Sequence, residues 1–269
     1  MSFNRPYLLT LGLCLMISVL GLSCHNEGQE ASNAPLRVGM ELAYPPFEMT
    51  DSRGTPTGIS VDLAEALGAA LGRRTVIVNM AFDGLIPALK TGKIDLIISS
   101  MTATPERSRS IAFSDPYLQT GLCLLVRKGR PIHDAAGLDR QGLVVAVKKG
   151  TTGHIWAVEH LKQSRLLVLD KEAAAVLEVV QGKADAFIYD QMSVYRNWQR
   201  NQETTDAVLA PFQKESWAIG VSKGDEALRS QVNRFLENFR AEGGFQRLGD
   251  VYLREMKEEF RRQGYPFFF

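Results

Sequence analysis

Apolar residues in this chain follow two periods. Short runs of branched apolar residues are bounded by polar residues or glycine, which is typical of buried strands. Between these runs, apolar residues return every three to four positions, which is typical of a helix with one buried face. In residues 61–73, for example, Leu63, Leu67 and Leu71 share one helical face. The alternation of strands and helices predicts a parallel α/β fold.

The alternation occurs twice along the chain. The first set has expected strands at residues 36–40, 75–79 and 94–98, and expected helices at 61–73 and 83–90. The second set has expected strands at 143–147, 166–169 and 184–189, and expected helices at 151–161 and 171–180. Asp83 is a suitable N-cap for the helix at 83–90. In each set a helix ends at Gly-Lys and an aspartate then enters a strand. Gly-Lys is also a common helix end, so this echo supports two similar lobes without proving them.

Two further β-like segments, at residues 120–126 and 216–221, lie where a chain of two lobes would cross between them. We therefore expect residues 36–121 and 218–269 to form lobe one and residues 122–217 to form lobe two. Helices expected at 226–239 and 245–260 would then pack back onto lobe one.

The N-terminus predicts export. A short basic segment precedes an apolar run at residues 7–20, which is shorter than the ~20 residues of a spanning helix. Small residues follow, and then Cys24. We expect residues 1–23 to be a signal peptide, Cys24 to be lipidated and the polar residues 24–35 to form a flexible tether at the membrane surface. The alternative is cleavage after Ser23 with Cys24 as a spare thiol.

The composition limits the classes of binding partner that we expect. Lysine and arginine number 31 against 30 acidic residues, so the net charge of +1 gives no electrostatic case for nucleic acid. Cys123 is the one cysteine in the expected folded part, which excludes an internal disulfide there, and its apolar strand indicates a small core residue. We expect no metal and no cofactor.

Polar and aromatic residues collect just after the expected strands. In open α/β sheets, ligands bind beyond the carboxyl ends of the strands. The candidate site residues at these ends are Glu41, Tyr44, Phe82, Ser99, Ser100, Thr102, Arg107, Thr152 and Asp190. Carboxylates, hydroxyls, one arginine and aromatic rings from both lobes suit a small zwitterion.

The two charges of a free amino acid match this set. An α-carboxylate prefers a guanidinium and backbone N–H groups, which Arg107 and the amides near Thr102 and Thr152 can supply. An α-ammonium prefers a carboxylate and carbonyl oxygens, which Asp190 and the Ser100 carbonyl can supply. Leaving either ligand charge unpaired in a closed cleft would cost several kcal/mol.

Each residue alone has an ordinary explanation. Tyr44 and Phe82 could be core aromatics, although together they could also sandwich a ligand side chain. Asp190 could be a helix N-cap, and Arg107 a solvated arginine in a first helical turn. The prediction therefore depends on their joint placement at strand ends.

Several sequence blocks resemble a known family. They are VGMELAYPPFE, AFDGLIPAL, IDLIISSMTATPERSRSIAFSDPY, VAVKKGTT and GKADAFIYD, together with a Gly-x-x-x-Asp-Leu motif at residues 58–63. As an ordered set from residue 36 to about 243, they resemble the polar amino-acid-binding proteins of bacterial ABC importers (solute-binding protein family 3). The family fold is a two-lobed α/β clamshell of the type II periplasmic-binding-protein class, with two β-like hinge crossings.

The resemblance implies that a polar or basic L-amino acid binds between the lobes and is delivered to an ABC permease in the membrane. By position it implies a carboxylate clamp by Arg107 with the amides of Thr102 and Thr152, ammonium contacts from Asp190 and the Ser100 carbonyl, stacking by Tyr44 and Phe82, and side-chain contacts from Glu41 and Ser99. We expect an exported monomer, on the periplasmic or cell-surface side, anchored by lipid on Cys24.

Two departures from the family pattern matter. The family usually has an acidic residue at the position of Ser60, and that acid often serves basic ligands, so a strict arginine or lysine preference is in doubt. Glu41 and Ser99 still favour a polar or basic ligand. The C-terminal stretch from about residue 254 is also longer than usual.

Two alternatives stay open at this point. The first is an enzyme, because some proteins that resemble this family are dehydratases of prephenate-like acids, with Glu41 or Asp190 as candidate acids here. We expect no enzyme, since an acid without an amine would not need an ammonium site. The second is a sensor domain, which we disfavour because no signalling or spanning segment follows.

Overall fold

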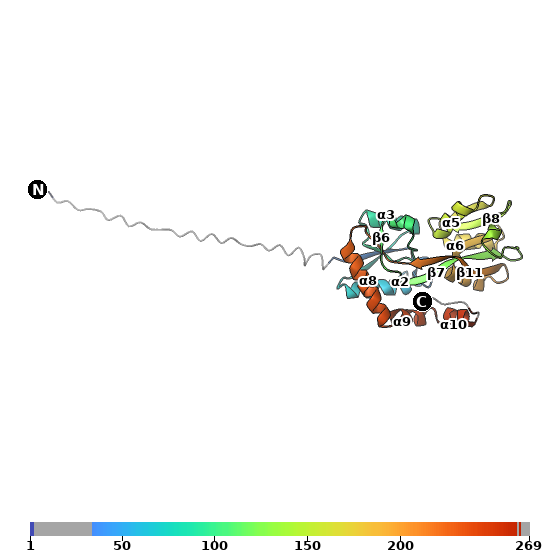
Figure 1. Cartoon of the computed structure of the whole chain (residues 1–269). Helices are drawn as coiled ribbons and strands as arrows, with labels where there is room; N and C mark the ends of the chain where they lie inside the picture. Colours follow the sequence, from blue (N-terminus) through green and yellow to red (C-terminus); the bar gives the residue numbers. More distant parts are fainter. Residues whose placement is uncertain (3–33, 263, 265–269) are drawn as a thin grey trace.

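The structure, a computed structural model, describes residues 1–2, 34–262 and 264. The expected signal peptide, Cys24 and most of the expected tether lie outside these described residues. The described part of the chain folds into two α/β lobes (Figure 1). Within residues 34–262, no helix combines the length and apolar character needed to cross a lipid bilayer.

The first lobe is built on a five-stranded sheet with the order β4-β1-β5-β12-β6. Its strands are β1 (Leu36–Met40), β4 (Thr75–Asn79), β5 (Leu96–Ile97), β6 (Ala112–Phe113) and β12 (Gly220–Val221). β1 runs parallel to β4 and β5, whereas β12 is antiparallel to β5 and β6. The helices of this part are α2 (Ile59–Ala70), η1 (Phe82–Gly84), α3 (Leu85–Lys90), α4 (Pro105–Ser108), α8 (Glu226–Ala241) and α9 (Gly244–Tyr252), and a small hairpin joins β2 (Met49–Thr50) to β3 (Pro56–Thr57).

The second lobe has a five-stranded sheet with the order β11-β7-β10-β8-β9. Its strands are β7 (Leu118–Arg127), β8 (Val144–Lys148), β9 (Arg165–Leu169), β10 (Ala186–Asp190) and β11 (Thr205–Trp217), and its helices are η2 (Ala136–Leu138), α5 (Thr152–His160), α6 (Glu172–Val180) and α7 (Gln191–Arg200). β8, β9 and β10 are parallel, and β7 is antiparallel to both β10 and β11.

The two lobes are joined by the antiparallel pair β7 and β11, which pairs Leu118 with Trp217 at one end and Arg127 with Thr205 at the other. The expected crossings are thus strands, and the second begins earlier than the sequence pattern indicated. The expected lobe boundaries fall inside β7 and at the end of β11. Cys123 on β7 is fully buried and unpaired by disulfide, as predicted.

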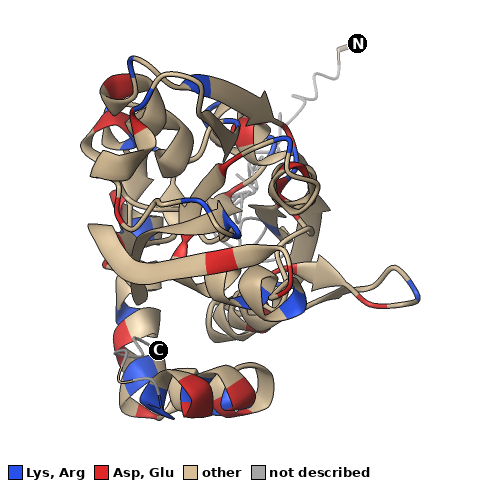
Figure 2. Ribbon diagram, turned by 90° about the vertical axis from the view of Figure 1, so that its right-hand side faces the viewer, with Lys and Arg blue, Asp and Glu red and all other residues tan. Residues whose placement is uncertain are grey.

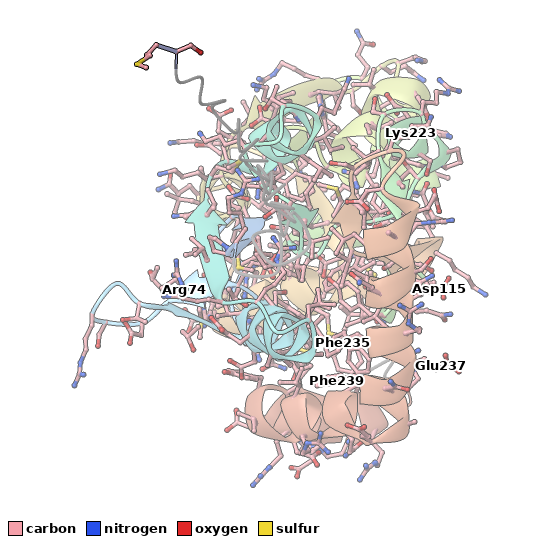
Figure 3. All side chains as sticks on the ribbon, turned by 90° about the vertical axis from the view of Figure 1, so that its left-hand side faces the viewer. Arg74, Asp115, Lys223, Phe235, Glu237 and Phe239 are labelled. Atoms are coloured by element: carbon pink, nitrogen blue, oxygen red, sulfur yellow. The ribbon has the colours of Figure 1, made fainter. Side chains whose placement is uncertain are left out.

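The first lobe is closed by α2 and α8, whose apolar faces meet. Leu63 and Leu67 on α2 are fully buried, and Phe235 on α8 belongs to the same cluster. Figure 3 shows Phe235 and Phe239 on the inward side of α8, while Glu237 points to solvent. Gly58 just before α2 has φ +118, and a Cβ there would lie 2.4 Å from the Phe47 carbonyl oxygen. The glycine therefore lets the first lobe's loop and helix meet closely.

The C-terminal helix differs from the prediction. The single helix expected at 245–260 is two helices, α9 and α10 (Arg254–Arg262). α8 and α9 contact α2, as expected for lobe one, but α10 does not stay there. Phe260, 1% exposed, packs in a second-lobe cluster, with its ring centroid 5.0 Å from that of Tyr195. Met256 contacts the cores of both lobes, so α10 spans them on the side opposite α3 and α5 (Figure 1).

The predicted cap at Asp83 is also wrong. Asp83 lies inside the 3-10 turn η1, and α3 begins after Gly84 without a side-chain cap. The Asp83 carboxylate instead forms an ion pair of 2.9 Å with Lys149 of the second lobe. Acidic and basic residues are otherwise mixed over both lobes (Figure 2), in line with the near-neutral net charge.

Candidate functional site

A cleft lies between the lobes at the carboxyl ends of their parallel strands. All nine residues predicted from the sequence line it: Glu41, Tyr44, Phe82, Ser99, Ser100, Thr102, Arg107, Thr152 and Asp190. Within the described ranges, no group of three or more His, Cys, Asp or Glu side chains is placed to hold a metal ion.

Arg107 is buried at the cleft rather than solvated. Thr104 caps α4 by accepting a 3.2 Å hydrogen bond from the Arg107 amide, which fixes the backbone. The Arg107 guanidinium donates 2.7 Å to the Thr102 carbonyl and 3.0 Å to the Gly150 carbonyl of the second lobe. Burial lowers the pKa of Arg107. A desolvated guanidinium held by carbonyls is well placed to meet an anionic ligand group.

Asp190 ends β10 and caps the start of α7, so the helix-capping role that the sequence offered is present. Its Oδ1 accepts hydrogen bonds of 3.0 and 3.1 Å from the amides of Met192 and Ser193, which caps the helix. The same oxygen accepts 2.6 Å from the Tyr44 hydroxyl of the first lobe. Burial raises the pKa of Asp190 to about 7, against the lowering effect of the Tyr44 hydrogen bond.

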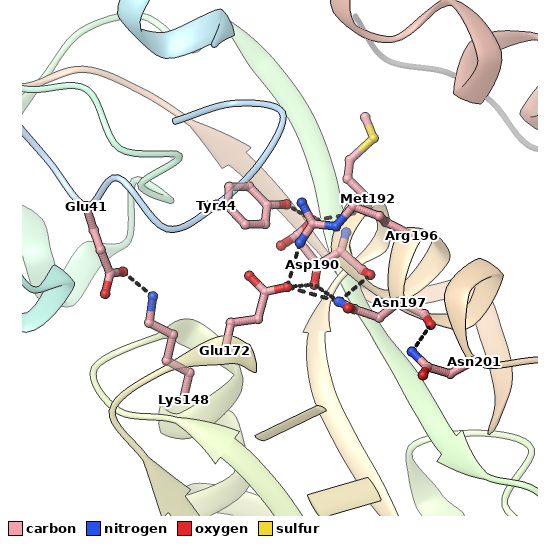
Figure 4. A network of polar contacts seen from close by, with 10 residues as sticks. Glu41, Tyr44, Lys148, Glu172, Asp190, Met192, Arg196, Asn197 and Asn201 are labelled. Carbon is pink, nitrogen blue, oxygen red and sulfur yellow. Dashed lines mark hydrogen bonds and ion pairs between the residues drawn. The ribbon is translucent and has the colours of Figure 1, made fainter. Parts of the chain in front are cut away.

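A lysine that we did not assign to the site faces the predicted Glu41. Lys148 is the last residue of β8, its side chain is 4% exposed, and it forms an ion pair with Glu41 across the cleft (Figure 4). Its ammonium also lies 5.4 Å from the centroid of the Phe82 ring. Its place at a strand end was visible in the sequence, but its partner in the other lobe was not.

Glu48 is an acid of the cleft that sequence reasoning missed. Its carboxylate accepts hydrogen bonds from the hydroxyls of Ser60 at 2.5 Å, Ser100 at 3.1 Å and Ser99 at 3.4 Å. Burial raises the pKa of Glu48 to about 8 despite these bonds. Ser60, which stands where the resemblance implies an acid, thus lies beside the carboxyl group of Glu48.

Six further residues line the cleft, and of these only Thr151 and Tyr189 lie in the quoted sequence blocks. The six are Leu122, Thr151, Gly153, Tyr189, Glu215 and Trp217. Glu215 on β11 accepts a 3.0 Å hydrogen bond from the Thr102 hydroxyl, so the crossing strand itself contributes an acid. At Gly153 a Cβ would lie 2.9 Å from the Ile188 carbonyl oxygen, so glycine lets the start of α5 approach β10.

The two aromatic candidates differ in their surroundings. Tyr44 is 5% exposed and stacks on Phe47 at 5.4 Å, with Trp217 edge-on at 6.0 Å, so it is also a core residue. Phe82 is half-buried, and the Arg107 guanidinium lies 5.4 Å from its ring centroid. Both rings border the cleft, so each can present an apolar surface to a bound side chain.

The family is shown by comparison with known proteins. Residues 36–255 match the bacterial extracellular solute-binding proteins, family 3. The chain belongs to this family. It is 31% identical over 250 residues to the L-arginine-binding protein of Pseudomonas aeruginosa, covering 88% of this chain and 95% of that one. It is also 31% identical over 262 residues to a probable histidine-binding protein of Neisseria gonorrhoeae, covering 90% and 94%.

Solved structures of the family share the fold. An ancestral arginine-binding protein bound to arginine superposes with a TM-score of 0.76 at 32% identity, covering 82% of this chain and 98% of that one. An ancestral amino-acid-binding protein that is a precursor of cyclohexadienyl dehydratase gives 0.76 at 34% identity, covering 83% and 96%. The family resemblance and the two-lobed clamshell predicted from the sequence are both confirmed.

Proposed function

We propose that this protein captures a free L-amino acid with a polar or basic side chain between its lobes and delivers it to an ABC importer. The observation that carries the proposal is the pairing of a buried guanidinium, Arg107, and a buried carboxyl group, Asp190, from opposite lobes at one cleft. Arg107 would bind the α-carboxylate and Asp190 the α-ammonium. The arginine- and histidine-binding relatives support the same class of ligand.

The charge balance of the cleft favours a ligand with a positive side chain. Its lining includes the acids Glu41, Glu48, Asp190 and Glu215 but only the bases Arg107 and Lys148. A pKa of about 8 keeps Glu48 largely neutral at pH 7, which still leaves one more ionised acid than base once Asp190 is ionised. An amino acid with net charge +1 would cancel that excess, so we infer arginine or a close analogue as the first candidate.

Among the described residues, polar contacts already join the facing lobes. Four examples are Arg107 to the Gly150 carbonyl, Tyr44 to Asp190, Lys148 to Glu41 and Lys149 to Asp83. Three of them use a predicted site residue, so a ligand entering the cleft would share or replace these partners. Binding would therefore be coupled to closure of the lobes about β7 and β11.

Titration calorimetry at pH 7.5 tests the ligand class. We expect arginine, lysine and histidine to bind, glutamine to bind more weakly, and glutamate not to bind, because a second carboxylate would face Glu41 and Glu48. A preference for glutamine over arginine would indicate that Lys148 neutralises Glu41 and that the pair binds a neutral amide. If none of the twenty amino acids binds, the proposed function is wrong.

A dehydratase is the second candidate. A carboxylic acid that stays protonated near pH 7 can act as a general acid, and the pKa of about 8 at Glu48 meets that requirement. The similar ancestral amino-acid-binding protein, a precursor of cyclohexadienyl dehydratase, also supports the dehydratase candidate. Incubation with prephenate decides the question. Consumption of prephenate that is lost in Glu48→Gln would establish an enzyme, whereas no consumption together with amino-acid binding supports a binding protein.

We also propose that lipid on Cys24 anchors the mature protein outside the cytoplasm, as a monomer. Mass spectrometry of the mature protein from its native membrane would show an acylated Cys24, and Cys24→Ser would release the protein in soluble form. Detection of cleavage before Cys24 without acylation would contradict the anchor but leave the binding function standing.

A further inference from the structure

A buried ion pair stands directly behind the binding cleft. Glu172, the first residue of α6, is 6% exposed. Its Oε1 accepts hydrogen bonds from three side chains of α7. These are the Ser193 hydroxyl at 2.5 Å, an Arg196 guanidinium nitrogen at 2.9 Å and the Asn197 amide at 3.0 Å (Figure 4). The network fixes the side chain of Arg196 on the first turns of the helix that Asp190 caps.

Arg196 also reaches the other lobe. Its guanidinium carbon lies 5.5 Å from the ring centroid of Tyr44, within the range of a cation–π contact. Tyr44 is the first-lobe residue whose hydroxyl donates to Asp190. Arg196 and Asp190 therefore hold the same tyrosine, one at its ring and one at its hydroxyl, when the lobes are closed.

The geometry at Asp190 leaves one oxygen for a ligand. Among the described residues, the hydrogen bonds from Tyr44, Met192 and Ser193 all end on Oδ1. Oδ2 is then the oxygen that can meet an ammonium group. Oδ1 therefore binds protein donors and Oδ2 is left for the ligand only while Arg196 keeps Tyr44 in this position.

We propose that Arg196 is a positioning residue of the binding site, which holds Tyr44 against Asp190 on closure and offsets the negative charge of Glu172 beside the Asp190 carboxylate. This inference builds on the proposed amino-acid function. Arg196 itself does not line the cleft, so it acts through Tyr44 and Asp190.

The charges around Asp190 support the second part of this role. The titratable groups that face it are Tyr44, Tyr189, Cys123, Glu172 and Arg196. Burial raises the pKa of Asp190 most, Glu172 raises it further, and Arg196 lowers it. The two members of the ion pair thus act on the pKa of Asp190 in opposite directions.

The first experiment follows the Asp190 carboxyl carbon by NMR in the ligand-free protein, with Asp190→Asn to assign the signal. We expect Arg196→Met to raise its titration midpoint by about half a unit to one unit, and Glu172→Gln to lower it by a similar amount. Arg200→Met is the matched control, because Arg200 is an exposed arginine one turn further along α7. Midpoints that are unchanged in both Arg196→Met and Glu172→Gln would overturn the charge role.

The second experiment measures arginine affinity between pH 5 and pH 9. We expect Arg196→Met to weaken binding about tenfold near pH 7 and less at pH 9, where Asp190 is ionised in both proteins. Arg196→Lys should restore the NMR midpoint but keep part of the high-pH loss, because an ammonium lacks the planar guanidinium over Tyr44. Affinity equal to that of Arg200→Met at every pH would overturn the positioning role.

The two arms separate the possible failures. If the wild-type protein binds no amino acid, the proposed function fails, while the NMR midpoints still decide whether Arg196 controls Asp190. If Arg196→Met does not fold, Arg196→Lys and Glu172→Gln carry the charge test. Arg196→Lys should keep the wild-type midpoint and Glu172→Gln should lower it, so a Glu172→Gln midpoint no lower than that of Arg196→Lys contradicts the inference.

Discussion

The Tyr44 hydroxyl donates a 2.6 Å hydrogen bond to Oδ1 of Asp190, which joins a loop of the first lobe to the end of a strand in the second, 146 residues later. This bond ties closure of the lobes to the acid that we assign to the ligand's ammonium.

Tyr44→Phe isolates this bond, because the ring keeps its contacts with Phe47 and Trp217. The Tyr44 hydrogen bond lowers the pKa of Asp190, so its loss should raise that pKa and weaken amino-acid binding several-fold near pH 7. Calorimetry at pH 6 and pH 9 checks this. A loss as large at pH 9 as at pH 6 would show that the hydroxyl acts through closure alone.

Arg107→Ala should abolish amino-acid binding while the fold stays intact. The ligand's carboxylate would be left without its guanidinium, and a buried unpaired charge costs on the order of several kcal/mol. Arg107→Lys should recover little, since an ammonium cannot bind a carboxylate through two parallel bonds. Thermal unfolding with and without ligand measures both effects. Near wild-type affinity in Arg107→Ala would refute the assigned site.

Asp190 can be tested separately as a cap and as a charge. Asn is a good N-cap, so Asp190→Asn should keep the start of α7 stable but lose ligand binding. Asp190→Ala should lose binding and also about 1 kcal/mol of stability, because the amides of Met192 and Ser193 lose their acceptor. Chemical denaturation and calorimetry on both variants give the comparison. Binding that survives in Asp190→Asn would contradict the ammonium assignment.

Glu48 should make stability depend on pH. Its pKa rises from 4.5 to about 8 on folding, so between these values the folded protein holds a proton that the unfolded chain has lost. This contribution therefore destabilises the fold progressively as pH rises from about 4.5 to 8. Glu48→Gln lacks this pH-dependent destabilisation. The difference between its melting temperature and that of the wild type should therefore shift in favour of the variant as pH rises from 5 to 8. A constant difference across this range would show that Glu48 titrates normally.

Phe260→Ala tests the span of α10 across the lobes. Removing a ring that is 1% exposed should cost about 3 kcal/mol in the free energy of unfolding. Val251→Ala is the control, because Val251 on α9 is 71% exposed and should change stability by less than about 0.5 kcal/mol. Equal unfolding free energies for the two variants in urea would mean that α10 does not contribute through Phe260.

Much of the cleft could be predicted because parallel strands bring their carboxyl ends to one edge. The positions of Glu41, Ser99, Arg107, Thr152 and Asp190 after expected strands were enough to place them at one site. The same logic could not find Glu215, because it lies in the polar stretch Gln213-Lys214-Glu215-Ser216 of β11, where no apolar run marks a strand beside the cleft.

The sequence by itself determined the order of strands and helices, the two-lobe plan and the residues at the strand ends, since these depend on local periodicity and on chain order. Only the tertiary structure decided which charges meet across the cleft, that Glu48 fills the space beside Ser60, and that α10 crosses to the second lobe. Those contacts join residues far apart in the chain, and burial in a shared low-dielectric space, which no local pattern records, sets the charge states of Glu48 and Asp190.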